Sequence, residues 1–573
     1  MTASNLFAVF PAQSVRIAID LVQENLKLFN LYQGSVLGTE VRDHIILVLV
    51  FFSSLVLVFA LIKGAFMYVM RQTLIVMSRH IEYDLKNEIF SHYQKLSMSF
   101  YRKNNTGDMM ARIAEDVSRV RMFIGPVIMY GINLVVTIVL VLWAMFSVNV
   151  KLSLYVLIPL PILSYMIFYV NNIIHQRSDA IQSQLSKVTS FVQEAYSGLR
   201  VIKSFAVENF SREDFENYAD DYRNRSLDLA KVDATFFPLM VFLTGMSTLI
   251  TIFAGGLLVI SGEISIGNIA EFVIYVNMLT WPVTSLGFIS SLTQRAAASQ
   301  SRINEFLEVE PEIVSDDLAS FHFEKEIEFR NVSFRYEGKT EYALKDISFT
   351  VNKGESLAIL GTTGSGKSTI AQLILRMMDA TEGQILIDGK DIRDINTKDF
   401  TEQIGYVPQD VFLFSDSIAN NISFGLKTEK SVTKERLNEA AKNAALLSTI
   451  NDFPQGFETV IGERGVTLSG GQKQRISIAR ALIKDPDILI LDDCLSALDN
   501  KTETEILNNL RSIMKEKTSF IISHRVSSVK DAGVIIMLEN GSICESGNHE
   551  QLMSENGRYA KLYQSQLFEE SVS

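Results

Sequence analysis

The chain has 573 residues, of which 47% are hydrophobic, and its formal net charge is −12 at pH 7. This hydrophobic share, together with a positive mean hydropathy, is high for a water-soluble chain of this length and indicates membrane-embedded segments. The acidic balance argues against nucleic acid as a partner. The two cysteines, Cys494 and Cys544, predict neither a disulfide framework nor a metal site.

The amino-terminal half contains five long stretches that lack Asp, Glu, Lys and Arg, and each exceeds the ~18 residues that a bilayer-spanning helix needs. An even number of spans requires a sixth, which only the extreme amino terminus can supply. Residues 1–15 are uncharged but short, so the first span is expected either to be unusually short or to begin upstream of this sequence. The predicted spans are at about 1–20, 44–62, 122–146, 152–176, 234–261 and 271–294.

Basic residues are concentrated between the spans in the long segments 71–121 and 177–231, whereas the turns at 147–151 and 262–271 are tight. The positive-inside rule therefore places the long segments in the cytoplasm. Both are expected to be helices that extend about 30 Å beyond the membrane, at ~1.5 Å per residue.

The hydrophobic pattern breaks after residue 306, where acidic residues cluster. We therefore predict a transmembrane domain over residues 1–310, a linker over 311–324 and a second domain over 325–573. The long basic segments and this second domain are expected to share the cytoplasmic side.

Near the start of the second domain, residues 361–368 read GTTGSGKS between a predicted strand at 356–360 and a predicted helix at 369–378. In that context successive backbone N–H groups and a helix N-terminus can face one phosphate. Lys367 would reach the β- and γ-phosphates, and the Ser368 hydroxyl would bind Mg²⁺. The candidate phosphate-binding residues are Gly361, Thr362, Thr363, Gly364, Ser365, Gly366, Lys367, Ser368 and Thr369.

Other short motifs accompany this loop at fixed spacing. They are VSFRY at 332–336, VPQ at 407–409, LSGGQ at 468–472, ILILDD at 488–493, SALD at 496–499 and ISHR at 522–525. Taken together, these motifs resemble those of the ATP-binding cassette (ABC) proteins over the predicted second domain.

The resemblance implies a role for one residue in each motif. Tyr336 would stack on adenine, and Asp492 would hold Mg²⁺ through water. Gln409 would sense the metal and the attacking water, and His524 would contact the γ-phosphate. Asp499 would lie across a dimer seam. ATP and Mg²⁺ are therefore the expected cofactors, with Mg²⁺ held near Ser368, Gln409 and Asp492.

The stretch at 468–472 is the most diagnostic, because general phosphate-loop enzymes lack it. In ABC proteins it presents a second helix N-terminus to the γ-phosphate of ATP bound on the opposite subunit. The residues are Leu468, Ser469, Gly470, Gly471 and Gln472. This chain has one such stretch, so the resemblance implies that it must dimerise.

One position departs from the family pattern. The catalytic glutamate that usually follows the Walker B aspartate is here Asp493, which keeps the charge but is one methylene shorter. In the family, Asp at this position is typical of one subunit of a heterodimer whose own ATP site is degenerate. Two alternatives stay open: a heterodimer with a catalytically weak site here, and a homodimer that works through Asp493.

The order of the domains on one chain resembles ABC exporters rather than importers. Gly462 and Gly465 flank a match to the exporter X-loop, and short coupling helices are expected at about 99–108 and 194–205. The expected fold is a membrane all-α domain, a six-helix exporter-type bundle with long cytoplasmic extensions, fused to an α/β P-loop ABC ATPase domain.

The expected function is ATP-driven export of an amphipathic or lipid-like substrate by alternating access, from a lipid bilayer that on family grounds is a bacterial inner membrane. The alternative is a regulatory, weakly hydrolysing subunit whose partner half-transporter carries catalysis. Phe, Met and Tyr are frequent in the predicted spans, which suits an apolar substrate but also suits contact with lipid.

Overall fold

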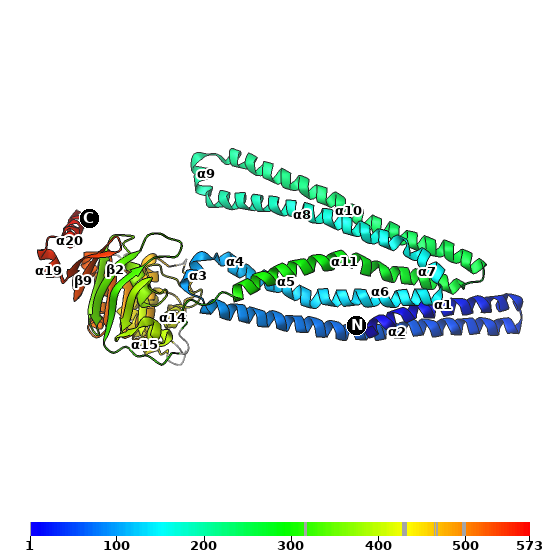
Figure 1. The fold of residues 1–573 in the computed structure, drawn as a ribbon, viewed down its shortest axis with the longest axis horizontal. Helices are drawn as coiled ribbons and strands as arrows, with labels where there is room; N and C mark the ends of the chain where they lie inside the picture. Colours follow the sequence, from blue (N-terminus) through cyan, green and yellow to red (C-terminus); the bar gives the residue numbers. More distant parts are fainter. Residues whose placement is uncertain are drawn as a thin grey trace. The chain divides into compact units, whose positions relative to one another are not determined.

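The computed structural model describes residues 2–314, 318–426, 432–462, 465, 468–495 and 500–572. The chain divides into two compact units, each drawn in Figure 1. The helical unit comprises Met1–Gln94 and Thr106–Val309, and the α/β unit comprises Lys95–Asn105 and Glu310–Ser573. The short segment Lys95–Asn105 thus belongs with the α/β unit, although its sequence neighbours belong to the helical unit.

Among the described residues, six helices are long and apolar enough to cross a membrane, which confirms the expected six-helix architecture. The first two are α1 (Thr2–Leu31) and α2 (Val36–Lys95). The other four comprise α4 (Thr106–Ala111), η1 (Arg112–Asp116), α5 (Val117–Met122), η2 (Phe123–Val127) and α6 (Ile128–Val148); α7 (Val150–Leu157) and α8 (Pro159–Ser197); α10 (Glu208–Ile260); and α11 (Ile266–Leu307). The short helix α9 (Leu199–Phe205) connects α8 to α10.

The ends of these helices differ from the sequence expectation in two places. α1 continues past the expected end at residue 20 to Leu31. The turn expected at 262–271 closes earlier, because Ser265 caps α11 through a reciprocal pair of hydrogen bonds with Asn268. Residues 266–271 are therefore helical. The turn at 147–151 centres on Asn149, whose side chain accepts a hydrogen bond from the Leu152 amide at 2.9 Å.

The helices leave much apolar surface outside. On α2, Leu47, Phe51, Leu57 and Leu61 are all exposed. In water such a surface would be costly, whereas lipid tails solvate it well. The composition of α2 is therefore explained by contact with a bilayer rather than by burial within the protein.

A polar network ties α1 to α11 inside the helical unit. Glu271 is fully buried and pairs with Arg16 at 3.2 Å, while the Tyr275 hydroxyl donates to Glu271 at 2.8 Å. Asp20 accepts a hydrogen bond from the Gly267 amide at 2.9 Å, at the start of α11. The buried carboxyl group thus has polar partners, as a polar group among apolar helices needs.

Within its described residues, the α/β unit contains two sheets. The four-stranded sheet has the order β2-β1-β4-β5 and is antiparallel, with β1 (Glu326–Phe334), β2 (Leu344–Asn352), β4 (Glu382–Ile387) and β5 (Lys390–Asp391). The six-stranded sheet has the order β10-β9-β3-β8-β7-β6, with β3 (Ser356–Gly361), β6 (Ile404–Val407), β7 (Ile488–Asp492), β8 (Thr518–Ser523), β9 (Val534–Glu539) and β10 (Ser542–Gly547).

Helices accompany both sheets of the α/β unit. They are α3 (Met98–Lys103), α12 (Lys367–Ile374), α13 (Thr397–Glu402), α14 (Ile418–Ser423), α15 (Lys434–Asn443), α16 (Leu447–Asp452), α17 (Gly470–Leu482), α18 (Asn500–Met514), α19 (His549–Ser554) and α20 (Arg558–Val572). Short helices thus stand at α3 and α9, where the sequence led us to expect coupling helices.

The larger sheet brings distant motifs to one edge. β3, β7 and β8 are parallel neighbours, and β3 pairs with β8 in register from Ser356 opposite Ser519. Their near-continuous apolar runs are buried on both faces, as parallel strands usually are. Because the carboxyl ends of parallel strands meet at one edge, the segments that follow Gly361, Asp492 and Ser523 converge there.

Candidate nucleotide site

The phosphate-binding loop leaves the end of β3 and enters α12. A Cβ on Gly361 would lie 2.4 Å from the Leu538 carbonyl oxygen, and Gly366 has a φ of +99°. Neither position accepts a side chain without strain, so the loop is held in a shape that only glycine permits. The helix begins at Lys367, two residues earlier than expected, and ends at Ile374 rather than 378, because Arg376 turns into the left-handed region at φ +48°.

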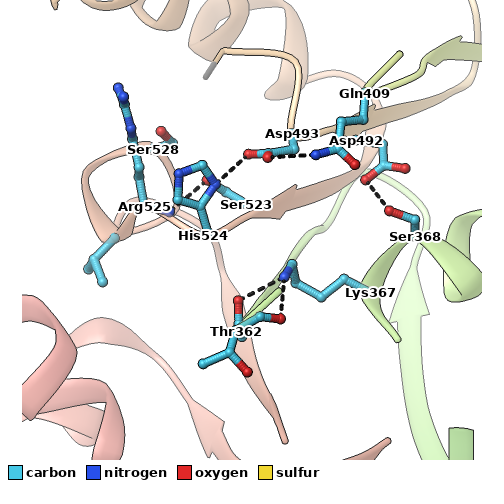
Figure 2. A network of polar contacts seen from close by, with 12 residues as sticks. Thr362, Lys367, Ser368, Gln409, Asp492, Asp493, Ser523, His524, Arg525 and Ser528 are labelled. Atoms are coloured by element: carbon cyan, nitrogen blue, oxygen red, sulfur yellow. Dashed lines mark hydrogen bonds and ion pairs between the residues drawn. The ribbon is translucent and has the colours of Figure 1, made fainter. Parts of the chain in front are cut away.

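Lys367 lies along this loop (Figure 2). Its Nζ donates to the carbonyl oxygens of Gly361 at 2.7 Å and Thr362 at 2.9 Å. Burial lowers the pKa of Lys367, while Asp493 and Asp492 oppose that shift. The ammonium group is therefore held over the loop that would surround the phosphates.

Asp492 and Ser368 form the second part of the site. The Ser368 hydroxyl donates to Asp492 Oδ1 at 2.9 Å, and Asp492 is almost fully buried. Burial raises the pKa of Asp492, the neighbouring Asp493 raises it further, and the hydrogen bond from Ser368 opposes both. A hydroxyl beside a buried carboxylate is a donor set that suits Mg²⁺, with phosphate and water oxygens completing its shell.

Sequence analysis missed one member of this group, Tyr406. Its hydroxyl bonds the Asp492 carboxylate, and burial raises the pKa of Tyr406, with Asp492 adding to the shift. Tyr406 lies on β6, which pairs with β7 in parallel, opposite Ile490. The pairing of these two strands places the phenol beside Asp492, and the sequence alone contains no motif that would have indicated it.

Asp493 joins the two other expected catalytic side chains. Its Oδ1 lies 2.8 Å from His524 Nδ1, and its Oδ2 accepts a hydrogen bond from Gln409 Nε2 at 3.3 Å. Figure 2 shows the Asp493 carboxylate between the imidazole and the amide. Gln409 therefore contacts the second aspartate rather than the Asp492–Ser368 pair. Asp493 itself has a φ of +45°, a region in which Asp is better tolerated than most residues.

Tyr336, the expected adenine platform, is fixed to the phosphate-binding loop. Its hydroxyl lies 2.9 Å from Thr369 Oγ1 on α12. Phe334 meets it edge to face, with ring centroids 4.9 Å apart. The base platform and the phosphate loop are thus one rigid arrangement, which suits a ligand that has a base at one end and phosphates at the other.

The signature stretch is organised by its own helix cap. Ser469 is the N-cap of α17, and its hydroxyl accepts from the Gln472 amide at 3.2 Å while Gln472 Oε1 accepts from the Ser469 amide at 2.9 Å. Gly470 and Gly471 form the first turn, where the helix dipole favours an anion. Asp499 lies outside the described residues, as do Glu463 and Arg464 of the X-loop match.

Comparison with known proteins agrees with this arrangement. The family "ABC transporter transmembrane region" matches residues 27–283, and the family "ABC transporter" matches residues 344–496. A probable multidrug resistance ABC transporter ATP-binding/permease protein, YheI of Bacillus subtilis, is 37% identical over 84% of this chain and 82% of its own length. The chain is an ABC exporter half-transporter.

Other similar proteins agree with this assignment. An ATP-dependent lipid A-core flippase of Desulfotalea psychrophila is 36% identical over 88% of both chains, and the multidrug resistance-like ATP-binding protein MdlA of Escherichia coli is 32% identical over 92% of this exporter and 88% of its own length. A bacterial Atm1-family ABC exporter with ATP bound shares the fold, with a TM-score of 0.75 and 24% identity over 98% of this exporter and 97% of that chain. The exporter is therefore an integral membrane protein with an ABC ATPase domain.

Proposed function

We propose that this exporter moves an amphipathic or lipid-like substrate across a bacterial inner membrane, driven by ATP and Mg²⁺. Six apolar helices and a complete phosphate-binding site on one chain support coupling between the two activities. Relatives whose names refer to multidrug resistance and to lipid A-core flipping support the substrate class. The observation that carries the proposal is the contact set of Lys367, Ser368, Asp492, Asp493 and His524 at one sheet edge.

We propose further that the working unit is a dimer. The capped N-terminus of α17 supports this, because in the family it completes the ATP site of the other subunit. The short helix α9 also supports it, since Leu199, Val201 and Phe205 are exposed apolar side chains on a turn between two long helices. Such a surface is suited to docking on a cassette.

In this mechanism the chain's own residues bind Mg·ATP and orient the attacking water. Lys367 would exchange the two loop carbonyls for phosphate oxygens, and Ser368 and Asp492 would hold Mg²⁺. Bound Mg·ATP supplies a γ-phosphoryl group whose transfer to water drives the cycle. Asp493 would orient that water, with His524 and Gln409 fixing its carboxylate.

Transport then depends on a difference in affinity. ATP at the seam of two cassettes can open the cavity outward only because it binds the closed dimer better than the open one. Hydrolysis removes the preference for the closed dimer, and the helices return to their starting conformation.

We propose that hydrolysis at this chain's own site is slow, because the Asp493 carboxylate has a shorter reach than the family's glutamate. Both of its oxygens are already engaged by His524 and Gln409. The site would then hold ATP while a second half-transporter with an intact site turns over.

The deciding experiment is multi-turnover phosphate release by this chain alone in lipid nanodiscs, with the Lys367→Ala variant as the blank. ATP binding without turnover above the blank supports a heterodimer. Sustained turnover contradicts the slow-site proposal and makes the chain a working homodimer through Asp493.

Transport needs its own assay. The chain, alone and with any co-purifying partner, would be placed in liposomes that contain a fluorescent phospholipid. ATP-dependent movement of the lipid between leaflets, absent with Lys367→Ala, is the expected result. Turnover without movement of lipids or of amphipathic dyes would overturn the proposed substrate class while leaving the ATPase intact.

A further inference from the structure

The helix α3 places a cation on the expected adenine platform. The Arg102 guanidinium lies over the Tyr336 ring, with its Cζ 4.7 Å from the ring centroid. Two further contacts hold it there: Nη2 donates to Gln372 Oε1 at 2.9 Å, and Nη1 lies 3.6 Å from Met378 Sδ. Arg102 and Tyr336 both belong to the α/β unit, so this is a contact within one compact body.

Other groups already contact much of the Tyr336 ring, so little of its surface is open for a base to stack on. Phe334 packs against it at a right angle, the ring also contacts the buried core of the α/β unit, and its hydroxyl is bound to Thr369. The guanidinium is planar, so it covers an aromatic face in the same way as a purine would. We propose that Arg102 occupies the place of the adenine base on Tyr336 and must leave it when ATP binds.

Arg102 can leave without detaching α3. Lys103 pairs with Glu337 at 2.5 Å, and the Ser97 and Ser99 hydroxyls donate to Glu312 at 2.8 and 2.5 Å. These contacts do not involve the Tyr336 ring, so they anchor the segment when the guanidinium moves.

There is also space and charge to receive the displaced side chain. A cavity of about 320 Å³ lies beside the ring and is lined by Arg102, Tyr336, Met378 and Asp379 among others. A guanidinium that leaves the ring would stay close to the carboxylates of Asp379, which also pairs with Arg376 at 3.2 Å, and Glu337, so its charge would keep a counter-charge nearby.

Arg102 and the adenine base of ATP would therefore compete for the same face of Tyr336. ATP binding includes the cost of breaking the Arg102–Tyr336 contact, so the affinity for ATP is lowered. Each binding event also changes a contact of α3, which short non-helical links connect to α2 and α4. This inference rests on the proposed function only in that ATP is the ligand of the site; it is independent of the substrate and of the speed of hydrolysis.

The test is equilibrium binding to the full chain in nanodiscs, with EDTA present to prevent hydrolysis. The ligands are ATP and inorganic triphosphate, which has the phosphates but no base. With Arg102→Ala we expect ATP to bind about three- to tenfold more tightly, because a cation–π contact of ordinary strength no longer competes. Triphosphate affinity is expected to stay the same or fall slightly, because a positive charge has been removed.

Two matched variants separate stacking from charge and from anchoring. Arg102→Lys keeps the charge but loses the planar stack, so it should also bind ATP more tightly. Lys103→Ala removes a neighbouring cation of α3 that is not on the ring, so the ratio of ATP to triphosphate affinity should stay at the wild-type value. Unchanged or weaker ATP binding by both Arg102 variants, with triphosphate binding intact, would overturn the proposal. Failure of the transport assay would leave this result unaffected.

Discussion

The two ends of the candidate nucleotide site, the proposed phosphate end and the proposed water end, are built in different ways. At the phosphate end, Gly361, Gly366 and the start of α12 fix the backbone, and side chains add to a shape that already exists. At the water end, the geometry depends on three side chains, Asp493, His524 and Gln409, that meet from separate segments.

We propose that this difference accounts for the position of Asp493, the expected departure from the family pattern, at the water end. The backbone of the expected phosphate-binding loop runs from the end of β3 at Gly361 to the start of α12 at Lys367. A water-orienting carboxylate can be shortened by one methylene and still make both of its hydrogen bonds. We therefore expect substitutions of Asp493 to change the rate of hydrolysis without disturbing ATP binding at the phosphate end.

The largest effect is expected at the phosphate end. Lys367→Ala should lower ATP hydrolysis by at least about 100-fold, because it removes the ammonium that would face the transferred phosphate. Phosphate release from the purified chain, paired with its partner if one is required, measures this. An unchanged melting temperature would confirm that the fold is intact, and residual turnover near wild type would contradict the role of Lys367.

Asp493→Asn tests the water end. Loss of the negative charge should lower hydrolysis by about 100-fold in any assembly where this site turns over, because general-base assistance of that size is lost. ATP affinity should stay close to wild type, which separates this variant from Lys367→Ala. If turnover of a heterodimer is unaffected by Asp493→Asn, catalysis belongs to the partner's site.

Tyr406→Phe tests the residue that the sequence did not indicate. Removing the phenol takes a hydrogen bond from buried Asp492, so we expect the Mg²⁺ concentration for half-maximal activity to rise about tenfold. ATP binding in EDTA should not change. A change in EDTA would instead indicate a general packing defect.

The smallest effect is expected from lengthening the carboxylate. Asp493→Glu should raise turnover by about threefold, because the longer side chain reaches further toward the attacking water. It should also cost about 1 kcal/mol in the free energy of unfolding, since φ is +45° at this position and Glu tolerates it less well than Asp. Slower turnover with unchanged stability would mean that reach does not limit the reaction.

The sequence predicted the phosphate end well, because glycine spacing and a strand-loop-helix order are local features. Family resemblance gave Asp493 and His524 separate catalytic roles, and their 2.8 Å contact emerged only from the structure. The sequence did not predict Tyr406 and Arg102, because each depends on a contact between segments that are far apart in the chain. Two boundaries differ from the expectation, and one residue accounts for each. Arg376 ends α12 early through its left-handed backbone, and Ser265 starts α11 early by capping it, so local conformation overrides periodicity.

The ion pair between half-buried Arg16 and fully buried Glu271 has a mechanical consequence for transport. Separating these side chains would leave a charge without a counter-ion among apolar helices, which is far costlier than sliding one apolar face past another. We therefore expect α1 and α11 to move together at this level during transport, and the passage for substrate to open between other helices.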